Sequence, residues 1–348
     1  MEPLTERQKM ILTLVVRDYI ETAQPVGSRH LLERFNLDIS SATVRNEMAA
    51  LTDAGYLHQP HASAGRIPSE DGYRYFVTHY GYQTDLPEPT RQTITHQFYQ
   101  ARQDVDQWMH LAVSILANQS RAASLITAPH SEKANFKHLE LISTQGRQVL
   151  MVLVLVGGEI LQQILTLAEP VSQEQLSAAA ETLNRVCVGL SAEKISKLSL
   201  QLNNLEHDIL GLLLEDMNEG DMRSSGEMYL DGLTNVLSEP EFNESTEAHR
   251  TLRMFEERSL LRDLLSKTTT NGKVGNVQVL IGGEGEFQEL KQCSVVLARY
   301  GIPGIATGAL GVFGPMRMSY SKNIPTVRFM ADLLSGLVSE TMLGDEAK

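Results

Sequence analysis

The stretch Ser40-Ser41-Ala42-Thr43-Val44-Arg45-Asn46-Glu47-Met48-Ala49-Ala50-Leu51 predicts one short helix that follows a serine cap, Ser40 or Ser41. Val44, Met48 and Leu51 share one helical face, which we expect to be buried. The opposite face carries small and polar residues: Ala42, Thr43, Arg45, Asn46 and Ala49. Arg and Asn are suited to reading guanine and adenine edges in a major groove, and the start of a helix can bind a phosphate. Taken alone, the stretch fits an ordinary amphipathic surface helix better than a DNA-reading helix. The neighbouring segments must therefore decide between these two interpretations.

Upstream residues predict two further helices. Thr5 and Gln8 have the spacing of a capping box, and an apolar stripe follows them at helical spacing. Pro25 and Gly27 break this helix, and Ser28 is expected to cap a second helix. A short link over residues 36–39 then leads into the Ser41 helix. Two short helices joined by a tight turn are typical of a helix-turn-helix.

Downstream residues predict a wing. Gly55 is expected to end the third helix, and residues 56–59 change to an extended pattern. The loop Pro60-His61-Ala62-Ser63-Ala64-Gly65 and the following Arg66-Ile67-Pro68 complete a hairpin. Arg66 would reach a phosphate or the minor groove from this wing. The predicted DNA-binding residues are therefore Ser40, Ser41, Ala42, Thr43, Arg45, Asn46, His61, Ser63 and Arg66.

The composition constrains the class of protein. The chain has 348 residues and a net charge of −13, which is unusual for a nucleic-acid binder. Residues 1–80 contain 8 Lys and Arg against 10 Asp and Glu, a net charge of −2, which leaves −11 for the rest. The acidity therefore lies mostly outside the predicted DNA-binding segment. Cys187 and Cys293 have neither disulfide nor zinc spacing and suit a reducing cytoplasm. The sequence shows no signal peptide, and its longest apolar run is too short to cross a membrane.

The rest of the chain alternates between helical and strand patterns. A Pro- and Gly-containing linker precedes helical spacing from Thr93 to about Ala123. Residues 136–167 predict an antiparallel meander whose central strand, Val149–Val156, would be covered on both faces. A capping box at Ser172 opens a helical block, and strands resume at Val277. A sheet interrupted by a helical block predicts an inserted subdomain.

Several of these motifs resemble the HrcA family of heat-inducible transcription repressors. The N-terminal ones are Leu4–Gln8, Pro25–Ser28, Ser40–Met48 and Gly55–Pro68, and the C-terminal ones are Leu290–Val296 and Gly308–Tyr320. The resemblance implies a repressor that binds the inverted-repeat element CIRCE upstream of chaperone operons. It also implies that the chaperonin GroEL promotes the active form, and that a GAF-like α/β domain holds an inserted dimerisation domain.

The expected fold is therefore an α+β multidomain chain. The expected boundaries are a winged helix-turn-helix domain at 1–82, a linker at 83–92, a GAF-like domain at 93–171 and 266–348, and a mainly helical dimerisation domain inserted at 172–265. The expected partners are double-stranded DNA, a second copy of the chain and GroEL.

Other readings compete with a simple repressor. A winged-helix regulator that responds to a small molecule through a pocket in the GAF-like domain is the main alternative. An enzyme is not expected, because no nucleophile, base or metal set stands out, and no cofactor or metal is expected. His58 and His61 lack a third nearby ligand. The glycines around Glu284 lack a phosphate-loop pattern. Arg317 is expected in packing or an interdomain ion pair rather than in a ligand site.

Overall fold

The chain folds into two compact units. One comprises Met1–Thr127, Met228–Tyr300 and Ala309–Lys348, and the other Ala128–Glu227 with Gly301–Gly308. The computed structural model describes residues 3–82, 85–100, 104–130, 135–156, 160–198, 201–223, 227–242, 253, 255, 257, 260, 261, 264, 265, 273–282, 287 and 290–343. The first unit holds both the N-terminal helices and a five-stranded sheet.

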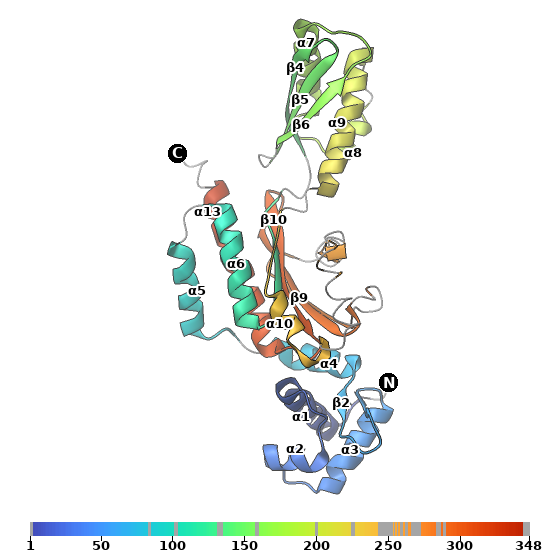
Figure 1. The fold of residues 1–348 in the computed structure, drawn as a ribbon, viewed down its shortest axis with the longest axis vertical. Coiled ribbons are helices and arrows are strands. Elements are labelled where there is room, and N and C mark those ends of the chain that lie inside the picture. Colours follow the sequence, from blue (N-terminus) through green and yellow to red (C-terminus); the bar gives the residue numbers. More distant parts are fainter. Residues whose placement is uncertain are drawn as a thin grey trace. The chain divides into compact units, whose positions relative to one another are not determined.

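The N-terminal part has the predicted order of three helices followed by a hairpin (Figure 1). Its elements are α1 (Glu6–Thr22), α2 (Ser28–Phe35), α3 (Ser41–Asp53), β1 (Leu57–His58), β2 (Ile67–Pro68), α4 (Glu70–Phe76) and the short π-helix η1 (Val77–Gly81). The two strands pair antiparallel. The helix-helix-helix-hairpin order of a winged helix is therefore present.

The helix caps explain where these helices begin. Thr5 and Gln8 form the predicted capping box of α1. The Ser40 side chain accepts a hydrogen bond from the Thr43 N–H, so Ser40 rather than Ser41 caps α3. The prediction for α2 was wrong: Gly27 is its N-cap, and Ser28 is the first helical residue. Gly55 follows α3 with a φ of 85°, the left-handed conformation that favours glycine after a helix.

The five-stranded sheet of the first unit has the order β7-β3-β10-β9-β8. Its strands are β3 (Ala123–Thr127), β7 (Met228–Asp231), β8 (Val277–Ile281), β9 (Cys293–Ile302) and β10 (Ala306–Pro315). The helices of this part are α5 (Glu88–Gln100), α6 (Val105–Ser120), α10 (Leu233–Leu237), the 3-10 turn η2 (Pro240–Phe242) and α13 (Tyr320–Leu343). Side chains of α6, including the buried Trp108, and of α13 contribute to the core.

Two short strands of this sheet were not predicted. β3 begins at Ala123, where the stretch expected to be helical ends, and β7 lies inside the expected helical block. Both strands are too short, at five and four residues, to show a clear period of two. They are held by partners far along the chain, since Ser124 pairs with Asp231 and Ile126 with Leu310. The predicted linker is also shorter than expected, because α5 already begins at Glu88.

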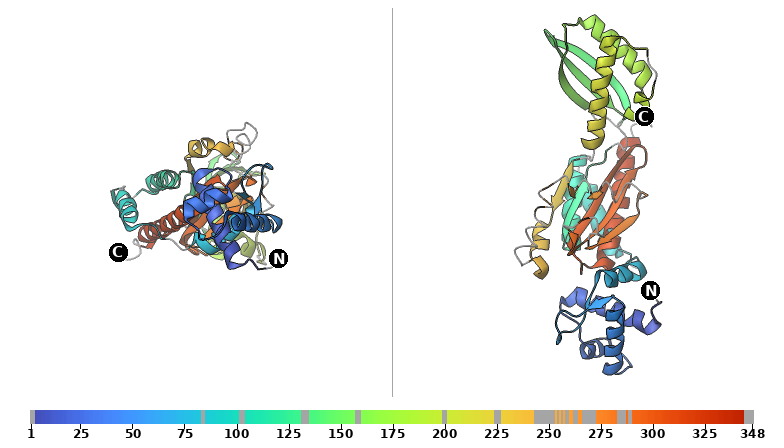
Figure 2. Two further views of the ribbon diagram at one scale, coloured as in Figure 1. Left: turned by 90° about the horizontal axis from the view of Figure 1, so that it is seen from below. Right: turned by 90° about the vertical axis from the view of Figure 1, so that its right-hand side faces the viewer.

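The second unit is a meander covered by helices. β4 (Phe136–Gln145), β5 (Gln148–Leu155) and β6 (Ile160–Thr166) pair antiparallel in sequence order. Helices α7 (Gln173–Cys187), α8 (Ala192–Ser196) and α9 (Asn204–Arg223) complete it. The strands lie together on one side of the helices (Figure 2). Residues from β4, β5, α7 and α9 share one hydrophobic core.

This arrangement differs from two expectations. The meander was assigned to the GAF-like part and the helices from residue 172 to an insert, but the structure joins them in one unit. The reason is that the alternating apolar residues of β5 need a cover, which α7 and α9 provide. The expectation that both faces of β5 are covered was wrong: its burial alternates, with the second face only partly buried.

Candidate nucleic-acid interface

Helix α3 has the two faces that its sequence predicts. Val44, Met48 and Leu51 are buried, with exposed fractions of 0%, 3% and 0%. Ala42, Arg45 and Asn46 are exposed on the other side. Because Ala42 is small, the backbone of α3 can approach a groove closely while Arg45 and Asn46 extend toward base edges. One buried face and one exposed face of this kind are what a recognition helix requires.

The hydroxyl groups at the start of α3 are used within the protein. The Ser40 hydroxyl lies 2.9 Å from the Thr43 hydroxyl and caps the helix. The Ser41 hydroxyl shares a hydrogen bond of 3.1 Å with the Ser28 hydroxyl at the start of α2. Ser41 therefore joins the first turns of the two helices, while Ser40 stays exposed. A hydroxyl bonded in this way can still accept or donate a further hydrogen bond.

The wing is tied to the body of the domain by its backbone. The Val26 N–H donates to the Arg66 carbonyl at 2.8 Å, and the Arg66 N–H donates to the Val26 carbonyl at 2.9 Å. A Cβ atom on Gly65 would overlap the Val26 carbonyl, so this approach requires glycine. His61 and Ser63 lie exposed on the loop between the strands. They are thus placed on a loop whose base is fixed.

Arg66 lies just before β2 on the wing, and its side chain also contacts α3. Its Nε donates a hydrogen bond of 2.9 Å to the Thr52 hydroxyl, and the side chain is half-buried. Thr52 lies in the last turn of α3. Arg66 therefore connects the wing to α3, and the Nη atoms of its guanidinium group have no hydrogen bond to another described residue.

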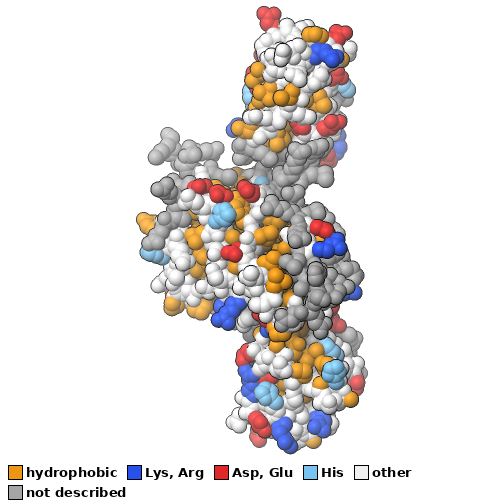
Figure 3. Space-filling model, in the orientation of Figure 1, with side chains coloured by type: hydrophobic (Ala, Val, Ile, Leu, Met, Phe, Trp, Pro, Cys, Tyr) orange, Lys and Arg blue, Asp and Glu red, His pale blue; other side chains and the backbone are white. Residues whose placement is uncertain are grey.

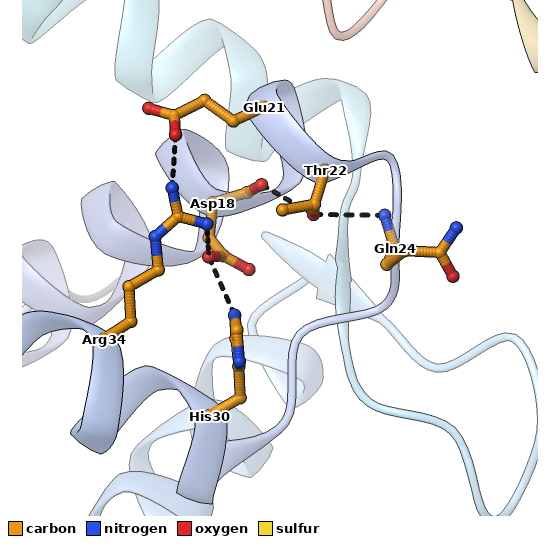
Figure 4. A network of polar contacts seen from close by, with 6 residues as sticks. All are labelled: Asp18, Glu21, Thr22, Gln24, His30 and Arg34. Carbon is orange, nitrogen blue, oxygen red and sulfur yellow. Dashed lines mark hydrogen bonds and ion pairs between the residues drawn. The ribbon is translucent and has the colours of Figure 1, made fainter.

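A buried carboxylate fixes α1 to α2 (Figure 4). Asp18 on α1 accepts from Arg34 Nη1 at 2.5 Å and from His30 Nε2 at 3.0 Å, both on α2. The Asp18 side chain is only 2% exposed, whereas those of Arg34 and His30 are 30% and 53% exposed. Arg34 also pairs with Glu21. Partners of this kind offset the cost of burying the Asp18 charge.

The charges around this surface are mixed. Figure 3 shows Lys, Arg and His side chains lying among acidic ones over the N-terminal part on the face drawn. Arg7 of α1 pairs with Glu47 of α3 at 3.5 Å. Burial lowers the pKa of His58, which favours its neutral form. In the part of the chain that the structure describes, no three His, Cys, Asp or Glu side chains gather as a metal site.

Sequence reasoning missed the residues that support the interface. Asp18, His30, Thr52 and Val26 contact partners far along the chain, and no local period marks such contacts. One signal was available: Asp18 falls within the apolar stretch of α1, where an acid needs a partner.

Comparison with known proteins supports this picture. Residues 106–324 match the family model for the HrcA protein C-terminal domain, and residues 1–65 match that for the LexA DNA-binding domain. Among the described residues, no helix has the length and apolar character needed to cross a membrane.

Curated relatives match along almost the whole chain. The heat-inducible transcription repressor HrcA of Roseiflexus castenholzii is 40% identical over 97% of this chain and 95% of its own. The HrcA repressor of Thermomicrobium roseum is 38% identical over 99% and 98%. A crystal structure of a protein described as hypothetical shares the fold, with a TM-score of 0.57 and 23% identity over 97% of this chain and 98% of that one. The chain therefore belongs to the HrcA family of heat-inducible transcription repressors.

Proposed function

We propose that this protein represses chaperone operons by binding the inverted-repeat CIRCE operator as a homodimer, with GroEL promoting its active form. The observation that carries the DNA-binding step is the exposed Ala42, Arg45 and Asn46 face of α3, whose opposite face is buried. This site would act where the chromosome is, in the cytoplasm. Its residues supply recognition and no covalent chemistry.

Binding to a defined duplex tests this proposal. Fluorescence anisotropy at fixed salt would compare a CIRCE duplex with a scrambled duplex of equal length and composition. We expect the CIRCE duplex to bind at least about a thousandfold more tightly, the lower end for specific DNA binders. Equal affinity for both duplexes would contradict the proposal.

An inverted repeat requires a two-fold protein, and the second unit offers a surface for it. Ile142, Leu150 and Ile164 form one cross-strand row on the outward face of the meander. Ile142 and Ile164 are 42% and 63% exposed, and Ile160 on the same face is 56% exposed. Contiguous exposed apolar side chains mark interaction sites. We assign this face to the second copy, and with it the role of a dimerisation domain within a GAF-like frame.

One substitution on this face would test the dimer. Ile164→Asp places a charge at the centre of the proposed contact and should give a monomer in analytical ultracentrifugation. Val188→Asp is the matched control, since Val188 is 59% exposed in the same unit but lies after α7. A dimer that persists in Ile164→Asp would move the interface elsewhere.

Folding competence provides the proposed link to GroEL. The sheet of the first unit forms only when distant parts of the chain meet. Ser124 contacts Asp231, 107 residues further along the chain, and Thr127 contacts Ala309, 182 residues further along. Such long-range pairing slows folding and leaves apolar surface exposed in intermediates, which a chaperonin can bind. Heat shock would fill GroEL with other clients and lower the amount of active repressor.

A refolding experiment tests this link. Added GroEL with ATP should raise the operator-bound fraction after refolding, and an excess of unfolded client should reverse the gain. Full recovery without GroEL at heat-shock temperature would contradict it.

The alternative is control by a small molecule. A cavity of about 110 Å³ in the first unit is lined by Asp85, Leu86, Arg91, Pro325, Arg328, Phe329 and Asp332. Ligand pockets are commonly about 300–1,000 Å³, so this one is small for an inducer. Operator binding that responds to a metabolite would favour this alternative.

A further inference from the structure

Two arginines lie on opposite sides of α3, and a side chain of that helix holds each of them. Arg66 of the wing donates a hydrogen bond of 2.9 Å to the Thr52 hydroxyl. Arg7 of α1 lies 3.5 Å from a carboxylate oxygen of Glu47 and forms an ion pair with it. Helical residues follow one another at about 100°, so Glu47 lies about 60° to one side of the buried Val44 and Thr52 about 80° to the other. The two arginines therefore border α3 from opposite flanks.

The guanidinium group of Arg7 can take a further partner. The Arg7 side chain is 54% exposed, and that of Glu47 is 20% exposed. Among the residues that the structure describes, Arg7 donates a hydrogen bond to none, so its contact with Glu47 is an ion pair alone. A guanidinium group carries five N–H donors in a planar fork, which fits the oxygens of a phosphate. Glu47 thus keeps this fork beside α3 while its donors stay available.

DNA phosphates lie on both sides of a helix that occupies the major groove. The groove is about 12 Å wide, and a helix with its side chains is about 10–12 Å across. The two sugar-phosphate backbones therefore run along the flanks of such a helix, where side chains from neighbouring elements reach them. In this protein the flanks of α3 carry Arg66 on one side and Arg7 on the other.

The carboxylate of Glu47 gives the charge of Arg7 a second role on this flank. Like charges that face each other across an interface weaken binding, so an unpaired carboxylate beside a phosphate would repel DNA. The ion pair with Arg7 neutralises that carboxylate. Loss of Arg7 would therefore remove a phosphate ligand and also expose an unpaired acid to the DNA.

We propose that Arg7 binds an operator phosphate on the flank of α3 opposite Arg66, and that Glu47 positions its guanidinium group. This inference rests on the proposed function, because it requires α3 to lie in the major groove. Arg7 and Arg66 then contact the two DNA backbones on either side of the helix that reads the bases. Phosphate contacts carry no base information, so Arg7 contributes affinity and register rather than base selectivity.

The salt dependence of DNA binding tests this assignment. Loss of one phosphate contact makes a plot of log K against log salt shallower by about one unit for each bound copy of the chain. Arg7→Ala should show this change on the CIRCE duplex and on the scrambled duplex. Its affinity for CIRCE should fall at least about tenfold at about 50 mM salt. Arg7→Lys keeps the charge and should retain most of the slope.

Lys9→Ala is the matched control, because it removes the same charge from the same helix. Lys9 follows Arg7 by two residues, which places it about 200° around α1. Its ammonium group is paired with Glu6 of the same helix at 2.7 Å. We expect Lys9→Ala to bind both duplexes with the wild-type slope.

Substitution of Glu47 distinguishes a phosphate contact from an ion pair that only fastens α1 to α3. Glu47→Gln leaves the charge of Arg7 in place, so it should weaken binding by at most about threefold and keep the slope. Added to Arg7→Ala, Glu47→Gln should recover about threefold in affinity, because no unpaired carboxylate then faces the phosphates. A purely structural pair would give equal losses in the two single variants and the wild-type slope in both.

The outcomes separate this inference from the proposed function. Since the pair is exposed, all variants should keep their thermal midpoint within about 2 °C of the wild-type value. A wild-type slope in Arg7→Ala, or an equally shallow slope in Lys9→Ala, would overturn the role of Arg7 and leave operator binding intact. Wild-type protein that binds both duplexes equally would overturn CIRCE recognition, and the slopes would still decide on Arg7. Wild-type protein that binds neither duplex would overturn both.

Discussion

Arg45 has an exposed side chain on α3, and the same helix buries Val44 and Met48 on its other face. Arg45→Ala should cost about 1–3 kcal/mol of specific binding and relax selectivity at one base position. Competition with operators substituted at single positions would measure both effects. Arg17→Ala on the exposed side of α1 is the control for the lost charge. Unchanged operator binding in Arg45→Ala would mean that α3 is not the recognition helix.

Arg66 can support DNA binding by contacting a phosphate or by fixing the wing to α3 through its hydrogen bond to Thr52. A substitution at Thr52 distinguishes these two roles. A lost phosphate contact makes the salt dependence of binding shallower, by about one unit of slope in a plot of log K against log salt. Thr52→Val removes the acceptor of the Arg66 Nε hydrogen bond and leaves the guanidinium itself in place; it also removes the 2.8 Å hydrogen bond that the Thr52 hydroxyl donates to the Met48 carbonyl within α3. We expect Thr52→Val to weaken binding with an unchanged slope, and Arg66→Ala to weaken it with a shallower slope. Wild-type affinity in Thr52→Val would exclude the positioning role of this hydrogen bond.

The sequence predicted which residues of α3 are exposed but not what supports them. A period of 3.6 assigns Val44, Met48 and Leu51 to one face without any knowledge of the partner. The bond from Arg66 to Thr52 spans 14 residues and depends on how the hairpin folds back. Such contacts follow from tertiary structure, so the sequence did not indicate that Arg66 is bonded to Thr52. The roles of His61, Ser63 and the other proposed DNA contacts remain predictions.

At the scale of elements, the Asp18 cluster should decide how firmly α1 holds α2. Asp18→Asn removes the carboxylate that Arg34 and His30 share, and Arg34 keeps only its pair with Glu21. Removing one partner of a buried ion pair lowers the free energy of unfolding by about 3–5 kcal/mol. Because Arg34 and His30 are partly exposed, we expect a loss at or below the lower end of this range. Urea unfolding of the full chain would measure the loss. Glu21→Gln removes the exposed partner of Arg34 and should change stability little. Equal losses in the two variants would contradict a special role for Asp18.

Helices and long strands followed from local patterns, whereas short strands did not. The capping boxes at Thr5 and Ser172 are confirmed, because side chain and backbone meet within three residues. Gly27 rather than Ser28 is the N-cap of α2, and the Ser28 hydroxyl is bonded to Ser41 across the turn. β3 and β7 exist because distant strands pair with them, and their sequences alone are compatible with the end of a helix.

At the scale of the whole molecule, the sequence revealed an interrupted sheet but not where the interruption begins. The meander was grouped with the later strands because both are apolar and extended. In the structure, it has no place in the order of the five-stranded sheet, and α7 and α9 cover it instead. Whether a helix packs on one sheet or on the other depends on contacts between residues far apart in the sequence. The periodicity of a single segment carries no information about such contacts.

This grouping predicts that residues 128–227 fold alone, because the core shared by β4, β5, α7 and α9 lies entirely within them. The fragment should show a cooperative thermal transition with mixed helix and strand content in circular dichroism.

Deletion of 172–265 from the full chain should instead disrupt both units, because it removes the cover of the meander and also β7, the partner of β3. Deletion of 128–227 is the matched control and should leave the first unit folded. A 172–265 deletion that retains a cooperative transition for the meander would show that the strands do not need α7 and α9, and would restore the boundary at residue 172.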